Sequence, residues 1–372
     1  MRLGLVRMHY HPGGGAERTL ELLARGLLER GHQVLVVTCS WQGQPPSGLE
    51  VALVDPGRGG GGARALGFAA AARRRMQAWR PHTWLSLDKV PGSPLYRAGD
   101  GCHAAWLERR SRLAPAWKRL GLRLDPKHRR WLKLERRTLE APELRLVLAN
   151  SRLVARELER LYGLGPDKVR LVRNGVDEKA LEAARPERVR REVRRELGLG
   201  HDQPVLLFLG SGFERKGLAF AIAALVHLPG VVLLVAGKDR TRAYRARAVR
   251  AGVGERVRFL GLRPDAPRLI SACDALVLPT IYDPCANACL EALYLGRPVV
   301  TTRADGAAEL VQPGVSGQVV DDPSDTRTLA AACELVLNLS GPFANPVPSR
   351  RSWLDQTLAL MEEAAQAGEE QP

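Results

Sequence analysis

The sequence predicts two α/β domains, each an open parallel sheet with helices on both faces. A chain of 372 residues is long enough for two hydrophobic cores, at roughly 150 residues per domain. Its short apolar runs, such as residues 33–39 and 230–237, are continuous, as in parallel strands buried on both faces. Segments with helical spacing separate these runs, and this alternation is typical of doubly wound sheets.

The first half alternates between strands and helices. A helix expected from residue 16 places Leu20, Leu23 and Leu27 on one face, and Gly31 follows as a stop signal. A second helix is expected over residues 151–163. The poly-glycine stretch 56–67 is expected to be a flexible surface loop. The expected strands lie within residues 2–8, 33–39, 83–87, 144–150 and 169–177.

The second half begins after the charged segment 185–200. Its expected strands lie within residues 204–210, 230–237, 257–261, 275–279 and 298–302. We therefore expect an N-terminal domain over residues 1–175, a C-terminal domain over 176–345, and a helix within 346–372 that packs back on the N-terminal domain. The residues after Ala364 are expected to fray. Ligands of doubly wound sheets bind beyond the carboxyl ends of the strands, so the loops after strands are the candidate sites.

The composition indicates an anionic partner. The chain has 56 Lys and Arg against 40 Asp and Glu, a net charge of +16 and a pI near 10.2. Nucleic acid and an anionic membrane surface both fit this charge. No apolar run approaches the roughly 20 residues that span a bilayer, and the N-terminus does not fit a secretory signal. We therefore expect a cytoplasmic protein with reduced cysteines.

Residues 103–137 combine strong positive charge with tryptophans. A basic helical face opposite Trp and Leu is typical of a helix at an anionic membrane interface. Nucleic-acid binding would use the same charge, and an ordinary solvated helix pair would pack its tryptophans inward. The membrane interpretation is favoured, and its expected contacts are Trp106, Trp117, Arg119, Arg123, Lys127, Arg130 and Trp131.

Two glycine-containing loops follow a strand and precede a helix, where backbone amides can approach a phosphate. The first, GGGAER at residues 13–18, fits neither the Walker nor the dinucleotide pattern, and a tight turn is an equal alternative. The second, GSGFERKG at residues 210–217, adds Arg215 and Lys216 at the start of a helix. A planar fork beside a compact charge suits a diphosphate.

A third stretch, IYDPCANACLEAL at residues 281–293, follows another strand. Asp283 is expected in the loop, and Glu291 about one turn inside a helix that starts at Asn287. Carboxylates bind sugar hydroxyls, and amides at a helix start bind phosphate. Cys285 and Cys289 lack companion ligands and the chain has no Asp-x-Asp, so we expect neither a zinc site nor a carboxylate-held Mg²⁺ or Mn²⁺.

Together these motifs resemble glycosyltransferase family 4, whose members are retaining enzymes of the GT-B fold. The resemblance covers nearly the whole chain and also includes ANSRLVARELERLYG followed by VRLVRNGVD, and DGAAELV at residues 305–311. Within the family, the chain is most similar to the lipopolysaccharide core glucosyltransferase I group. That group shares the GS-F-RKG pattern, a stretch like TCSW at residues 38–41, and a basic membrane-binding insertion in the N-terminal domain.

The resemblance implies a role for each motif residue. Arg215 and Lys216 would neutralise the diphosphate of the donor, and Asp283 would bind hydroxyls of the transferred sugar. Glu291 would hold the ribose, and Asp100 would contact the acceptor. Glu309 would be structural or lie near the nucleotide. The remaining donor-binding positions are Gly14, Gly15, Gly210, Ala286, Asn287 and Ala288.

Two departures leave the identity of the sugar open. Asp283 stands where the family usually has Glu, and Thr19 stands where the group tends to carry an Asp that faces the sugar. The resemblance implies a monomer at the inner face of the cytoplasmic membrane that moves a hexose, expected to be glucose, from UDP-glucose to a lipopolysaccharide core glycolipid without metal or cofactor. The alternatives are another donor sugar or lipid-linked acceptor and, from another class, a basic nucleic-acid-binding protein. A nicotinamide dehydrogenase is disfavoured because the glycine fingerprint is missing.

Overall fold

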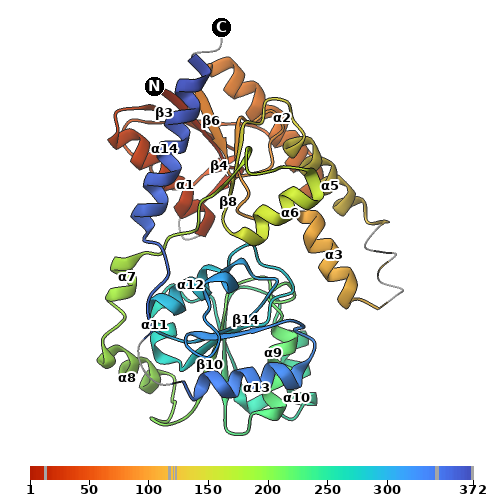
Figure 1. Ribbon diagram of the computed structural model, residues 1–372, viewed down its shortest axis with the longest axis vertical. Helices are drawn as coiled ribbons and strands as arrows, with labels where there is room; N and C mark the ends of the chain where they lie inside the picture. Colours follow the sequence, from red (N-terminus) through yellow and green to blue (C-terminus); the bar gives the residue numbers. More distant parts are fainter. Residues whose placement is uncertain (12–14, 116–118, 120, 122–123, 340–342, 370–372) are drawn as a thin grey trace. The chain divides into compact units, whose positions relative to one another are not determined.

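The computed structural model describes residues 1–11, 15–115, 119, 121, 124–339 and 343–369 (Figure 1). The chain divides into two compact units, Met1–Arg173 with Arg351–Pro372, and Asn174–Arg350. The sequence places the division two residues later, after residue 175. The final helix, α14 (Arg350–Glu369), belongs mainly to the first unit. None of the described helices is both long and apolar enough to cross a membrane.

The first unit contains a parallel seven-stranded sheet in the order β5-β3-β1-β6-β7-β8-β9. Its strands are β1 (Arg2–Val6), β3 (Gln33–Thr38), β5 (Leu49–Leu53), β6 (Thr83–Ser86), β7 (Leu95–Arg97), β8 (Leu146–Ala149) and β9 (Val169–Leu171). Two short strands, β2 (His9–Tyr10) and β4 (Ser40–Trp41), pair just beyond β1 and β3. The order reverses between β1 and β6, which is the switch point where such sheets bind ligands.

Helices cover both faces of this sheet. On one face, α1 (Gly15–Glu29) packs with α14 through a buried cluster that includes Leu23, Leu27, Leu358 and Met361. A Cβ added to Gly26 would lie 2.8 Å from Leu358 Cδ1, so the glycine permits this close packing. On the other face lies α2 (Gly61–Trp79). The remaining helices are α3 (His103–Leu113), α5 (Pro126–Leu139) and α6 (Arg152–Tyr162).

The structure corrects two expectations about glycine-rich and terminal segments. Helix α2 begins at Gly61, so the second half of the poly-glycine stretch is helical and not a loop. Burial of Ala65 and Phe68 against the sheet outweighs the low helix propensity of the glycines. The chain also stays helical beyond Ala364, because Ala365 is fully buried against the sheet.

The second unit contains a parallel six-stranded sheet in the order β12-β11-β10-β13-β14-β15. The strands are β10 (Val205–Leu209), β11 (Val232–Ala236), β12 (Val257–Gly261), β13 (Ala275–Leu278), β14 (Val299–Thr302) and β15 (Gly317–Val320). Counted along the unit, this is the 3-2-1-4-5-6 order of dinucleotide-binding folds. Its switch point lies between β10 and β13.

Two helical layers enclose the second sheet (Figure 1). One layer contains α8 (Glu187–Glu196), α11 (Ala266–Ala272) and α12 (Asn287–Tyr294), and the short α7 (Glu178–Glu182) precedes it. The other contains α9 (Leu218–Ala224), α10 (Arg242–Arg250) and α13 (Thr326–Leu337). Both faces of the central strands are therefore buried, which explains their continuous apolar sequences.

Candidate active site

The predicted site residues of the second unit meet at the switch point of its sheet. Arg215 and Lys216 lie in the loop after β10, and Asp283 lies in the loop after β13. Lys216 Nζ donates to Asp283 Oδ2 at 2.9 Å, and Arg215 Nη1 lies 2.9 Å from the same oxygen. Arg215 also donates to the carbonyl oxygen of Tyr282 at 3.0 Å. Two cations thus share one carboxylate.

The two cations keep the pKa of the Asp283 carboxyl low despite its burial. Burial raises the pKa of Asp283, but Lys216 and Arg215 outweigh burial and hold it below its usual value. The Lys216 side chain is only 10% exposed, whereas that of Arg215 is 36% exposed. The cluster carries one net positive charge, and its more exposed member can meet an anion from solvent.

Gly210 allows the lysine to reach this position. Its φ is +130°, and a Cβ there would lie 2.6 Å from Lys216 Cε. The lysine side chain therefore lies directly over the backbone at the end of β10. A donor-binding role for Gly210 stays a prediction.

Substitution of Gly217 with alanine is expected to destabilise the protein and displace Lys216. Gly217 has φ +78°, and its Cβ would lie 1.9 Å from the carbonyl oxygen of Pro279. We expect a loss of about 2–4 kcal/mol in the free energy of unfolding, measured by urea denaturation. Gly252→Ala is the matched control, because Gly252 has φ +71° and open space around its Cβ position. An equal loss in both variants would contradict the steric argument.

Asp305, which follows β14, completes the cluster and was not predicted. Its carboxylate accepts hydrogen bonds from the amides of Ala286 at 3.0 Å and Ala307 at 2.9 Å. It also accepts from Thr301 Oγ1 at 2.9 Å and from Cys289 Sγ at 3.5 Å. Burial and the charge of Asp283 raise the pKa of Asp305 to about 6.

The motif DGAAELV contains this residue, but the resemblance singled out Glu309 within it. Glu309 is exposed in the short 3-10 helix Gly306–Leu310. The backbone amide of Gly306 donates to the carbonyl oxygen of Asp283 at 2.9 Å. The sequence signal for Asp305 was an acid directly after the strand at residues 298–302, which is a candidate position in any doubly wound sheet.

The start of α12 lies beside these acids. The backbone amide of Ala286 donates a hydrogen bond to Asp305. Asn287 Oδ1 accepts from Asn174 Nδ2 at 2.8 Å. Ala288 lies in the first turn of the helix, and Glu291 is partly buried one turn further on. Roles of these residues toward a donor stay predictions.

The cysteines of this motif are buried free thiols. Cys289 is fully buried, and burial raises its thiol pKa well above the ordinary value. Cys285 is 9% exposed and is also a free thiol. Among the described residues, no three His, Cys, Asp or Glu side chains are grouped to hold a metal ion. Transfer without a metal stays a prediction.

In the first unit, the carboxyl edge of the sheet holds an acid that was not predicted. Asp88 follows β6 at the switch point, where it accepts from the Met8 amide at 2.6 Å and from Arg7 Nη1 at 3.0 Å. Burial raises the pKa of Asp88, and the nearby charge of Asp100 adds to the increase. Asp100 is exposed just after β7, so the predicted acceptor residue lies near Asp88.

The other predicted positions of this unit are less defined. Thr19 is partly buried in α1, and Gly15 is the first residue of that helix. Gly14 lies outside the described residues. A cradle formed by these glycines stays a prediction.

The basic insertion contains helices α3 and α5. A buried carboxylate of α5 binds the start of α3. Glu135 of α5 is fully buried and accepts from the amides of His103 at 2.5 Å and Ala104 at 3.0 Å. It also lies 3.4 Å from Lys89 Nζ and accepts from Tyr162 Oη at 2.5 Å. Because a carboxylate at a helix N-terminus satisfies its free amides, Glu135 fixes α3 against α5.

The predicted membrane contacts differ in exposure. Arg119, Lys127 and Arg130 are exposed. Trp106 is partly buried, while Trp131 packs against the core cluster that includes Phe68 and Leu134. Trp131 therefore serves at least in part as a core residue. Trp117 and Arg123 lie outside the described residues.

Comparisons with known proteins agree with this architecture. Residues 13–180 match Glycosyltransferase Family 4, and residues 203–338 match Glycosyl transferases group 1. The lipopolysaccharide glucosyltransferase WaaG of Escherichia coli K12 is 27% identical over 93% of this chain and 90% of its own length. A probable transglycosylase of Burkholderia thailandensis is 31% identical over 88% of this chain and 84% of its own length.

Solved structures show the same fold. The crystal structure of WaaG superimposes with a TM-score of 0.79 and 25% identity, covering 98% of this chain and 99% of that one. Anabaena HepE, solved with UDP and glucose, superimposes with a TM-score of 0.70 at 20% identity, covering 97% of this chain and 99% of that one. The chain therefore belongs to glycosyltransferase family 4, has the GT-B fold and is a nucleotide-sugar-dependent transferase.

Proposed function

We propose that the protein transfers a hexose, with glucose the leading candidate, from UDP-glucose to a glycolipid of the lipopolysaccharide core with retention of configuration. WaaG of Escherichia coli and LpsE of Rhizobium meliloti, a lipopolysaccharide core glycosyltransferase that is 29% identical over 90% of this chain, support this substrate class. The observation that carries the proposal is the Arg215–Lys216–Asp283 cluster at the switch point.

The cluster suits departure of a nucleoside diphosphate. Negative charge develops on the leaving oxygen, and fixed positive charge at that point lowers the barrier. Arg215 and Lys216 would supply this charge without a metal. A bound diphosphate would compete with Asp283 for Lys216, which leaves the carboxylate available for hydroxyls of the sugar. The acceptor hydroxyl would then attack from the face that the diphosphate leaves.

A donor screen tests this proposal. Nucleotide release would be measured with UDP-glucose, UDP-galactose, UDP-N-acetylglucosamine and GDP-mannose in the presence of a truncated lipopolysaccharide core acceptor. We expect turnover with UDP-glucose to exceed the others by at least about tenfold, as a site that hydrogen-bonds a particular hydroxyl discriminates strongly. Preference for another donor would reject glucose, and no dependence on the core acceptor would reject the acceptor class.

The insertion supports a peripheral position on the inner face of the cytoplasmic membrane. The exposed residues of α5 include six cations and no acid: Lys127, Arg129, Arg130, Lys133, Arg136 and Arg137. Leu113 at the end of α3 and Leu124, two residues before α5, are 37% and 60% exposed. Basic side chains beside exposed leucines are typical of a helix at an anionic lipid surface.

Reversing two of these charges, Arg130→Glu with Lys133→Glu, is expected to weaken membrane binding. Each cation near an anionic surface contributes about 1 kcal/mol, so partitioning should fall at least about thirtyfold. Flotation with vesicles that contain phosphatidylglycerol measures the effect. Arg188→Glu with Arg191→Glu on the exposed side of α8 is the control of equal charge change. An equal loss in the control, or tighter binding to nucleic acid than to vesicles, would contradict the membrane assignment.

A further inference from the structure

A pocket lies in the first unit, at the edge of the sheet opposite Asp88 and Asp100. It has a volume of about 790 Å³ and lies at the amino ends of three strands. Thr83 is the first residue of β6, Pro94 precedes β7, and Arg145 precedes β8. Because doubly wound sheets bind substrates at their carboxyl edge, this pocket is separate from the transfer chemistry.

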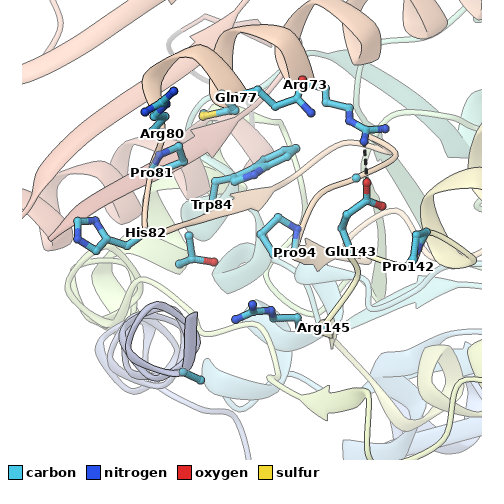
Figure 2. A pocket seen from close by; sticks show the side chains of 14 residues that line it. Arg73, Gln77, Arg80, Pro81, His82, Trp84, Pro94, Pro142, Glu143 and Arg145 are labelled. Carbon is cyan, nitrogen blue, oxygen red and sulfur yellow. Dashed lines mark hydrogen bonds and ion pairs between the residues drawn. The ribbon is translucent and has the colours of Figure 1, made fainter. Parts of the chain in front are cut away.

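The lining of the pocket is strongly cationic. It includes Arg73, Arg80 and Arg145 against a single carboxylate, Glu143, which pairs with Arg73 at 2.6 Å. Figure 2 shows this ion pair at one end of the pocket, Arg80 and His82 at the other, and Arg145 across from Trp84. Within the described part of the chain, neither Arg80 nor Arg145 has a carboxylate within ion-pair distance. Two positive charges are therefore uncompensated.

Arg73 and Arg145 contact nearby backbone, and Arg80 has an unusual backbone conformation. A Cβ added to Gly92 would lie 2.8 Å from Arg73 Nε, so the glycine lets this side chain pack directly on the backbone. Arg145 Nη1 donates to the carbonyl oxygen of Ala364 at 3.4 Å. Arg80 ends α2 with φ +51°, and it is the single non-glycine residue with positive φ among those described. Glycine is the usual residue at such a helix end, so an arginine there is unexpected on backbone grounds.

The lining also contains a buried hydroxyl group that has no hydrogen-bond partner in the described part of the chain. Thr83 is 3% exposed, and its Oγ1 has no hydrogen-bond partner among the described residues. Buried hydroxyl groups are nearly always hydrogen-bonded in folded proteins. The Thr83 hydroxyl is thus a buried polar group without a described partner in the wall of the pocket.

We propose that this pocket binds a phosphate-bearing small molecule or head group. Guanidinium groups bind phosphate oxygens in a forked geometry, and two uncompensated charges match a phosphate dianion. The volume exceeds that of a lone phosphate and lies in the range of small-molecule sites. Trp84 and Pro94 supply a flat apolar wall for the group that carries the phosphate.

Isothermal titration calorimetry of the full-length protein with inorganic phosphate and with glycerol 3-phosphate tests the site. Arg80→Gly and Arg145→Ala are expected to raise the Kd at least about tenfold, as each removes a charge-assisted hydrogen bond. Arg80→Gly also relaxes the left-handed backbone, so its loss of binding cannot come from misfolding. Arg74→Ala, an exposed neighbour on α2, and Lys216→Ala in the transfer site are expected to leave this Kd within about twofold.

Flotation with vesicles that contain phosphatidic acid separates the two sources of phosphate. If Arg145→Ala loses phosphate binding in calorimetry but floats with the vesicles as the wild type does, the ligand is a soluble molecule. If the variant also loses binding to the vesicles, the ligand is a lipid head group. Unchanged phosphate binding in both pocket variants would overturn the proposal.

Discussion

Replacement of Lys216 with alanine is expected to lower kcat at least about hundredfold, because the lysine supplies fixed positive charge where the leaving diphosphate becomes negative. The substitution also leaves Asp283 buried with Arg215 as its remaining cationic partner, so the carboxylate would hold Arg215 more tightly. Arg215 would then be less available to the donor. Steady-state nucleotide release with a saturating acceptor measures the effect.

The control is Lys179→Ala, which removes an exposed lysine of α7 in the same unit and should leave kcat unchanged. Lys216→Arg is expected to restore part of the activity, as it keeps the charge but is longer than the space over Gly210 allows. Turnover at the wild-type rate in Lys216→Ala would reject the diphosphate role. If circular dichroism shows that Lys216→Ala is unfolded, the lower rate would instead indicate that Lys216 is needed for folding.

Asp305→Asn is expected to lower kcat about tenfold to hundredfold at pH 7.5 and to remove a pH dependence near pH 6. The ionised carboxylate accepts four hydrogen bonds, which fix the start of α12 and the loop that carries Asp283. An asparagine amide nitrogen can only donate, so it would face the donors of Thr301 and Cys289. Small displacements of a site of this kind cost up to about a hundredfold in rate.

The pH profile separates a positioning role from a merely structural one. Burial raises the pKa of Asp305 to about 6, so the folded state holds a proton between about pH 4 and 6 that the unfolded chain has lost. The contribution of this group to stability therefore falls as pH rises through that window. Activity should rise through the same window, because the ionised form accepts all four bonds.

Both pH effects should disappear in Asp305→Asn and persist in Asp202→Asn, which changes an exposed acid. The measurements are kcat and the midpoint of urea unfolding from about pH 4 to 8. An unchanged activity profile in Asp305→Asn would contradict the assignment.

The sequence predicted the strands that are buried on both faces and the motifs that follow them. Runs such as residues 204–210 are continuous and apolar, and they match strands within one or two residues. The strands that escaped prediction are short or partly exposed. The edge strand β5 has no fully buried residue, β7 has three residues, β2 and β4 have two each, and β15 has four. A run of that length carries no period that distinguishes it from a loop.

The glycine-rich start of α2 shows a different limit. Local propensity indicates a loop over residues 56–67, yet Ala65 and Phe68 are buried against the sheet. Tertiary burial of an amphipathic segment outweighs a local preference of about 1 kcal/mol per glycine. The burial of Ala65 and Phe68 is set by parts of the chain that lie far away in sequence.

The sequence by itself determined the fold class, the family and the two cations at the end of β10, because these depend on residue types at short spacing. Only the tertiary structure placed Lys216, Asp283 and Asp305 together, since strand order decides which loops meet at a switch point. It also decided that Asp305 carries a raised pKa and that Trp131 packs inward, because burial depends on the whole fold. Contacts between residues far apart in the chain leave no periodic signal in the sequence.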